Sequence, residues 1–198
     1  MGERKLDVLI LTHYHSDHAN GVLELLERLE VETLVVPDVE PESVLRQTIL
    51  KDASKQGTAV MYITNRYTFS MGQAVFTVYP PMGEDDANEE CLSVLATEGS
   101  FDVLMTGDMG DSSEERLVQQ GSLPDIELLV VGHHGSKYST SEKLLDAVTP
   151  ETAVISVGYN SYGHPTEEIL DRLEKNKIQI YRTDTAGTVT VKLQEGSE

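Results

Sequence analysis

The chain has 198 residues and is strongly acidic, because 34 Asp and Glu residues outnumber 15 Lys and Arg residues and give a formal charge of −19. This charge argues against a broad nucleic-acid-binding surface, which is normally basic, but it does not exclude a nuclease whose metal ions hold the reacting phosphate. No apolar run approaches the roughly 20 residues that cross a bilayer, and no signal peptide is visible behind Met1.

The length and the single cysteine predict one domain, over residues 1–198, without an internal disulfide. Cys91 lies in an apolar strand pattern, so we interpret it as a small core residue and not as a nucleophile. Most of the acidic side chains are interpreted as a solvated surface.

Apolar periodicity predicts strands and helices that alternate along the chain. The first half is predicted to form a strand at 6–11, a helix at 19–29, a short strand at 33–36 stopped by Pro37, a helix at 42–56 that ends at Gly57, several antiparallel strands within 59–79, an acidic loop at 80–90 and a hairpin of strands at 91–96 and 101–105. The second half is predicted to form a helix at 112–120 capped by Ser112 or Ser113, strands at 128–131, 153–157, 178–181 and 188–193, and helices at 141–148 and 167–175. This pattern is typical of mixed sheets flanked by helices.

Four metal-ligand side chains lie within six residues, directly after the first predicted strand: His13, His15, Asp17 and His18. Alternation along an extended chain puts His13 and His15 on one side. If a helix begins near Asp17, then Asp17 and His18 lie beside them but aim at a different point. Such pairs of ligands can serve two adjacent cations, and imidazole and carboxylate suit zinc, manganese or iron. The alternative is an ordinary polar loop, although half of the chain's six histidines are here.

Three later segments also place a histidine or an aspartate where a predicted strand ends. Asp108 follows 103–107, the pair His133-His134 follows 128–131, and His164 lies in the loop after 153–157. In α/β folds, ligands bind where strands end and loops begin, so the four segments together predict one convergent site. Each segment alone is a weak signal, since an Asp after Gly is more often a turn residue.

The chain resembles the metallo-β-lactamase superfamily in His-x-His-x-Asp-His at 13–18, Thr-Gly-Asp at 106–108 and His-His-Gly-Ser at 133–136. More narrowly, it is similar to the hydrolase domain at the C-terminus of ComEC competence proteins, in Tyr-Gly-His-Pro at 162–165 and in the ending at 181–184 and 187–189. The resemblance runs through essentially the whole chain. It implies an αββα sandwich and a hydrolase that uses two divalent metal ions, with zinc expected first and manganese as the alternative.

The resemblance also implies roles for individual residues. The implied metal ligands are His13 and His15 for the first ion, Asp17 and His18 for the second, Asp108 as the bridge, and His134. Neighbouring residues of an extended segment point to opposite sides, so only one of His133 and His134 is expected to bind metal, and His134 is preferred. The implied catalytic residues are Asp17, Asp108, His133 and His164, and the implied substrate contacts are Ser136, His133 and His164.

Two of these roles have structural alternatives. His164 is expected to contact a phosphate oxygen or to protonate the leaving alkoxide, but a turn histidine that touches no substrate is an equal alternative. Ser136 is expected to donate a hydrogen bond to phosphate, and the alternative is a loop residue that caps a helix.

The chain departs from the superfamily pattern in two ways. The first motif begins at His13, so the opening strands of the fold and their early aspartate are missing, and we expect a fragment truncated at its N-terminus or separately encoded. An exposed sheet edge near 6–11 then predicts self-association. Residues 19–132 contain no histidine. The first metal position is therefore expected to bind less tightly than the second.

The resemblance implies a phosphodiesterase or nuclease of the ComEC type, active in DNA uptake, and places the chain in a bacterial domain that is soluble, cytoplasmic or tethered to a membrane protein. Two alternatives stay open at this point. One is a metallo-hydrolase of another ester, a lactone, a thioester or a β-lactam. The other is a degenerate domain that binds metal or a partner without catalysis.

Overall fold

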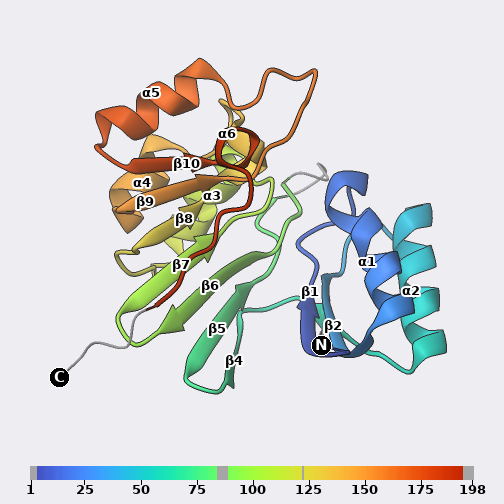
Figure 1. Cartoon of the computed structure of the whole chain (residues 1–198). Coiled ribbons are helices and arrows are strands. Elements are labelled where there is room, and N and C mark those ends of the chain that lie inside the picture. The colour runs from blue at the N-terminus through green and yellow to red at the C-terminus, as the bar shows by residue number, and fades with distance from the viewer. Residues whose placement is uncertain (1–3, 84–88, 122, 194–198) are drawn as a thin grey trace.

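The computed structural model describes residues 4–83, 89–121 and 123–193, and in it two β-sheets stack face to face with helices on both outer sides (Figure 1). This arrangement is the αββα sandwich that the resemblance implies. Among the residues described, no helix is long and apolar enough to cross a membrane.

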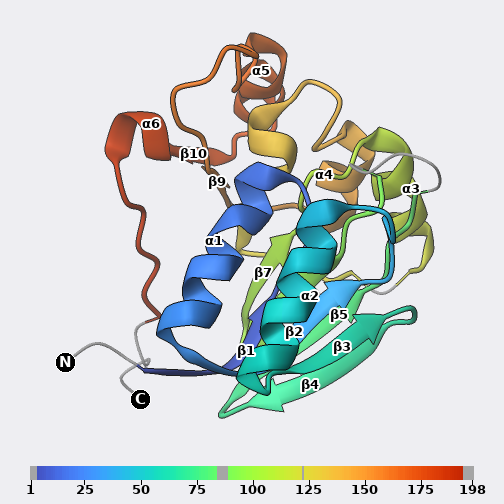
Figure 2. The same ribbon diagram turned by 90° about the vertical axis from the view of Figure 1, so that its right-hand side faces the viewer.

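The smaller sheet has three parallel strands in the order β1-β2-β3. Its strands are β1 (Lys5–Ile10), β2 (Glu30–Pro37) and β3 (Ala59–Ile63), and its helices are α1 (Ser16–Arg28) and α2 (Val44–Gln56). The two helices lie side by side across the outer face of this sheet (Figure 2). Among the residues that the structure describes, β1 pairs only with β2 and therefore forms one outer edge of the sheet.

The larger sheet has seven strands in the order β10-β9-β8-β7-β6-β5-β4. Strands β4 (Tyr67–Met71), β5 (Ala74–Tyr79), β6 (Ser93–Glu98) and β7 (Phe101–Met105) are antiparallel, and β8 (Leu128–Val130), β9 (Thr152–Ile155) and β10 (Gln179–Arg182) continue the sheet parallel to β7. The helical segments of this half are α3 (Asp111–Gln119), the 3-10 turn η1 (Gly132–Gly135), α4 (Glu142–Val148), α5 (Glu167–Lys175) and α6 (Thr183–Ala186).

Three clusters of buried apolar side chains hold these layers together. One packs α1 and α2 on the small sheet, and another packs α3, α4 and α5 on the large sheet. The third joins the sheets and contains Val35, Ile63, Val78, Leu92 and Val94. Each fully buried aliphatic side chain of this kind stabilises the fold by about 1.5–3 kcal/mol.

The helix ends follow local signals in the sequence. Ser43 caps α2, because its hydroxyl accepts a hydrogen bond from the amide of Arg46 at 3.4 Å, and Gly57 ends the helix at a φ of 77°. Only a residue that tolerates the left-handed region fits there at low cost. The expected end of this helix is therefore confirmed.

Three expectations are wrong. Residues 59–63 were expected to pair in an antiparallel set, but β3 joins β2 in parallel, because the helix α2 carries the chain back to the start of the small sheet. Helix α3 begins after Gly110 without a side-chain cap, so neither Ser112 nor Ser113 is the N-cap. The segment 188–193 is not a strand, because α6 and Gly187 turn the chain across the inner face of the large sheet (Figure 1).

Two smaller points concern the loops around β6. Strand β6 begins at Ser93, so Cys91 lies just before it, but the thiol is fully buried in the core as expected. Residues 84–88 of the predicted acidic loop lie outside the described residues.

Candidate metal centre

The predicted site residues gather at one edge of the sandwich, where the strands β1, β7, β8 and β9 end. Parallel strands deliver their carboxyl ends to the same edge, so the residues that follow them meet there. A cleft of 380 Å³ at this edge is lined by six of them: His15, Asp17, Asp108, His133, His134 and His164.

The first motif folds as the alternation predicts. His13 is fully buried, whereas Tyr14 points into the core behind it and donates a hydrogen bond to the carbonyl of Pro37 at 3.1 Å. Helix α1 begins at Ser16, one residue earlier than Asp17. Extended backbone therefore positions His13 and His15, and the first turn of a helix positions Asp17 and His18.

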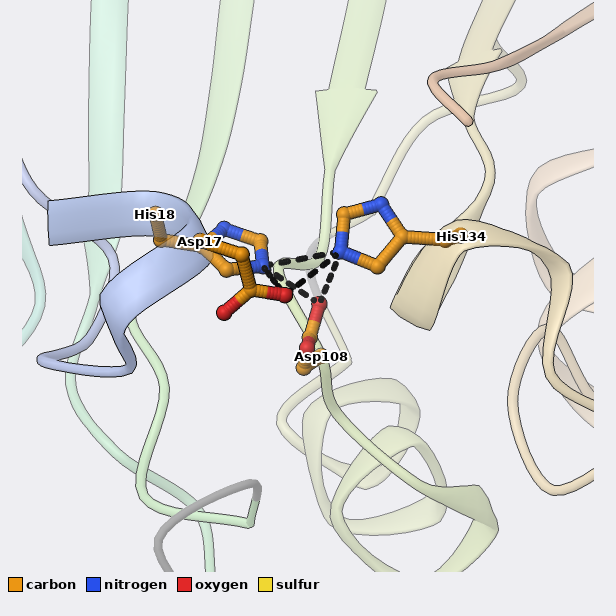
Figure 3. A group of neighbouring side chains, drawn as sticks. All are labelled: Asp17, His18, Asp108 and His134. Atoms are coloured by element: carbon orange, nitrogen blue, oxygen red, sulfur yellow. Dashed lines mark hydrogen bonds and ion pairs between the residues drawn. The ribbon is translucent and has the colours of Figure 1, made fainter. Parts of the chain in front are cut away.

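Asp17, His18, Asp108 and His134 form a four-residue cluster whose ligand atoms all lie within 4.8 Å of one another (Figure 3). The Nε2 atom of His18 lies 3.1 Å from Nε2 of His134 and 3.2 Å from the Oδ1 atom of Asp108. Two imidazole nitrogens and two carboxylates that converge on one point match the donor set of zinc, manganese or iron sites.

His13, His15 and Asp108 form a three-residue cluster, again with ligand atoms within 4.8 Å. The Nε2 atom of His13 is buried and lacks a hydrogen-bond partner among the residues described, and its Nδ1 atom lies 3.1 Å from the hydroxyl of Thr12. An unpaired buried polar atom costs about 1–3 kcal/mol. A cation bound between the three side chains removes this cost, so the residues fit a second metal ion.

Asp108 lies between the two clusters. Its Oδ1 atom faces His18, and its Oδ2 atom lies 3.7 Å from Nε2 of both His13 and His133. Burial acts to raise the pKa of this carboxyl group, but the hydrogen bond and charge of His18, aided by His13 and His133, outweigh burial and lower the pKa to about 2. Asp108 is therefore an anion at neutral pH and can contact two cations at once.

The pKa values of two histidines also shift. Burial lowers the pKa of His13 to about 3, so its imidazole is neutral and available as a ligand. Burial acts to lower the pKa of His18 too, but its hydrogen bond to Asp108 and the charges of Asp108 and Asp17 raise it overall.

Two turns in the later motifs require glycine, because of their backbone angles and their close packing. Gly107 has a φ of 62°, and a Cβ atom there would lie 3.2 Å from the Cβ of Cys91. Gly135 has a φ of 87°, and its Cβ would lie 2.5 Å from the Cβ of Pro165. Both turns need the left-handed region and close packing, which only glycine allows at low cost. They bring Asp108 and the histidine pair to the site.

The histidine pair is not extended, contrary to the sequence-based argument. His133 and His134 both have left-handed backbone angles, with φ of 47° and 53°, in the turn η1. His134 lies in the four-residue cluster, and its Nδ1 atom is 2.7 Å from the carbonyl of Ser156, which leaves Nε2 facing the cluster. His133 belongs to neither cluster, but its ring lies 5.7 Å from that of His164.

His164 and Ser136 differ in their access to the cleft. His164 lines the cleft, and burial lowers its pKa below the usual 6.5. Ser136 is buried, and its hydroxyl accepts a hydrogen bond from the amide of Tyr138 at 3.3 Å. This contact agrees with the loop-residue alternative for Ser136.

Sequence reasoning missed the residues that brace the site. Glu114 of α3 is fully buried and accepts hydrogen bonds from the amides of Thr140 and Ser141, at 2.6 and 2.7 Å. Arg172 of α5 donates to the carbonyls of Ser139 and Thr140, both at 2.8 Å. Together they hold the loop that follows η1. The only signal in the sequence was that Glu114 and Leu117 share one helical face.

The sequence matches known proteins over most of its length. The family described as the β-lactamase superfamily domain matches residues 2–138. ComE operon protein 3 of Bacillus subtilis (strain 168) is 32% identical over 95% of this chain and 25% of its own length. Competence protein ComA of Neisseria gonorrhoeae is 32% identical over 98% of this chain and 26% of its own length. The chain thus spans about a quarter of the length of these relatives.

A solved structure with the same fold is CmlA, a diiron β-hydroxylase from Streptomyces venezuelae. It aligns with a TM-score of 0.63 at 17% sequence identity, over 91% of this chain and 44% of CmlA. At this identity the similarity concerns the fold alone.

Proposed function

Because the chain belongs to the metallo-β-lactamase superfamily, we propose that it is a metal-dependent phosphodiesterase and that it can act as a nuclease. The observation that supports this most is the place of Asp108, one carboxylate oriented toward histidines on both sides. In this proposal His13, His15 and Asp108 hold one divalent ion, and Asp17, His18, Asp108 and His134 hold the other. When bound, such a pair supplies Lewis acidity that lowers the pKa of water and stabilises charge on the reacting oxygens.

The charge of the cleft supports an anionic substrate. Two divalent ions against the carboxylates of Asp17 and Asp108 leave the lining of the cleft net positive, although the whole chain carries −19. Positive charge in a cleft attracts and orients a phosphodiester locally. An uncharged lactone or thioester gains less from it. The similarity to competence protein ComA supports nucleic acid as the phosphodiester substrate.

His133 and His164 contact the substrate in this proposal. Their rings lie 5.7 Å apart, and both line the cleft beside Asp108. Since burial keeps His164 neutral near pH 7, its imidazole donates a hydrogen bond to a phosphate oxygen more readily than it delivers a full proton. His133, whose Nε2 atom lies 3.7 Å from the Oδ2 atom of Asp108, contacts the phosphate beside it.

The test is hydrolysis by the full chain after removal of metal and reloading with Zn²⁺, Mn²⁺ or Fe²⁺. The substrates are bis(p-nitrophenyl) phosphate, a single-stranded oligonucleotide, an ester, a lactone and a thioester, and the metal content is measured on each sample. We expect phosphodiester hydrolysis, lost in Asp108→Ala and kept in Asp111→Ala, which changes an aspartate outside both clusters. Faster hydrolysis of the neutral substrates would favour the other hydrolase class. Bound metal without turnover of any substrate would favour a non-catalytic metal-binding domain.

A further inference from the structure

A pocket of 460 Å³ adjoins the four-residue cluster and is formed mainly by the loop at 157–164. Asp17 and His134 of the cluster line the pocket, and Tyr159 and Tyr162 are among the loop residues that line it with them. We propose that this pocket binds an unpaired nucleobase of the substrate by stacking. The inference rests on the proposed phosphodiesterase function and adds the part of the substrate that the site recognises.

Both tyrosines are largely exposed to solvent. Tyr159 is 106% exposed and Tyr162 is 82% exposed, relative to the residue type. The ring of Tyr162 also lies nearly parallel to that of His164, with centroids 6.1 Å apart and planes inclined by 24°. Exposed aromatic faces beside a catalytic cleft commonly mark a binding site for another planar group.

Hydrogen bonds to Asn160 hold the loop that carries these rings. Its Oδ1 atom accepts from the amides of Tyr162 and His164 at 3.1 and 3.0 Å. Its Nδ2 atom donates to the carbonyls of Gly158 and His164 at 3.0 and 2.8 Å. These four hydrogen bonds hold the loop in one conformation, which reduces the conformational entropy that is lost when a base stacks there.

The chemistry of the pocket points to a base and not to a second phosphate. None of the described residues that line it is Lys or Arg, and its wall includes the apolar side chain of Val157. A phosphate needs positive charge, whereas a stacked base needs a π face and an apolar wall. A base inside a duplex already has both faces covered by its neighbours. The pocket therefore fits single strands and frayed ends.

A binding experiment tests the inference without relying on turnover. The chain loaded with Mn²⁺ is titrated with thymidine 5′-monophosphate and, separately, with 2-deoxyribose 5-phosphate, which carries the same phosphate without a base. We expect thymidine monophosphate to bind about 5- to 150-fold more tightly, the range that stacking of one base produces. Tyr159→Leu and Tyr162→Leu should each remove most of this difference, whereas Tyr162→Phe should keep it.

Tyr67→Leu is the matched control, because Tyr67 is an exposed tyrosine of β4 outside the pocket, and it should bind both compounds like wild type. Equal affinity of the wild type for the two compounds would overturn the inference, and so would an unchanged preference in both leucine variants. If the chain hydrolyses phosphodiesters but shows equal affinities, the pocket proposal fails alone. If it prefers the nucleotide but hydrolyses nothing, the proposed function fails and the stacking pocket stands.

Discussion

The buried carboxylate of Glu114 provides a sharp test of how the site is supported. Glu114 lies on α3, outside both metal clusters, yet it accepts hydrogen bonds from two consecutive amides, those of Thr140 and Ser141. These amides belong to the loop that follows the histidine pair. Replacing Glu114 with alanine leaves both amides without their acceptor, and we expect a large loss of stability together with weaker metal binding at His134.

The size of the loss follows from these two contacts. A buried amide that loses its acceptor costs about 1–3 kcal/mol, so the pair costs at most roughly 2–6 kcal/mol, with the part-buried amide of Ser141 contributing less than that of Thr140. The substitution also removes the cost of burying the carboxyl group, the same burial that raises the pKa of Glu114 to about 7. The net loss is therefore expected in the lower part of the range, at about 2–4 kcal/mol.

The assay is urea unfolding followed by circular dichroism, on metal-free wild type, Glu114→Ala and Glu115→Ala. The control removes the same atoms at the next position of the same helix, where Glu115 is 44% exposed and pairs with Lys143 at 2.6 Å. A surface ion pair of this kind contributes about 0–1 kcal/mol. If Glu114→Ala lies within 1 kcal/mol of wild type, or if the two variants lose equal stability, the bracing role of Glu114 is refuted.

Four further predictions concern the metal centre and the sheet edge. Asp108→Ala should lose both ions and at least about 100-fold in kcat/KM, because changing residues that only orient metal ligands already costs about 10- to 100-fold. His164→Ala should lower the rate with its metal retained, and elemental analysis after dialysis would instead show a loss of metal if His164 is a ligand. Titration of the metal-free protein should give two unequal affinities, and the tighter event should disappear in His18→Ala but not in His13→Ala, because the four-residue cluster offers one more ligand. Burial lowers the pKa of His13 from 6.5 to about 3, so the unfolded chain binds more protons than the folded chain between these two pH values. The free energy of unfolding of the metal-free protein should therefore fall as the pH drops from about 6.5 toward 3. In His13→Gln this dependence on pH should be weaker. The outer edge of β1 should pair with a second copy of the chain; light scattering that finds a strict monomer with full metal content would contradict this.

Much of the site could be predicted from consecutive residues. The alternation of a strand places His13 and His15 together, and the start of a helix turns Asp17 and His18 toward a second point, as the two clusters show. The rule that ligands gather at the ends of strands also brought Asp108 to the same edge. These features depend on local geometry, which three or four neighbouring residues determine.

Other features depend on groups that are far apart in the sequence. The left-handed turn at His133 and His134 is followed by Gly135, which packs closely against Pro165, and no pattern at 133–136 reveals that neighbour. The bond between Glu114 and the amide of Thr140 joins positions 26 residues apart. Single-sequence patterns contain no record of such pairs.

Sheet membership was likewise decided by the tertiary structure. The patterns of 59–63 and 188–193 both predict ordinary strands, but 59–63 pairs in parallel with β2, whereas 188–193 pairs with no strand in the part of the chain that the structure describes. The apolar pattern of a segment indicates that one of its faces is buried, but it does not identify the strand or helix that covers this face. The sequence by itself therefore predicted most of the elements and two groups of candidate metal ligands, and the same residues lie in the two clusters of the structure. Packing between segments that are distant in the sequence decides three other features: the choice of strand partners, the turn at the histidine pair and the hydrogen bonds of Glu114. Only the tertiary structure brings these segments together.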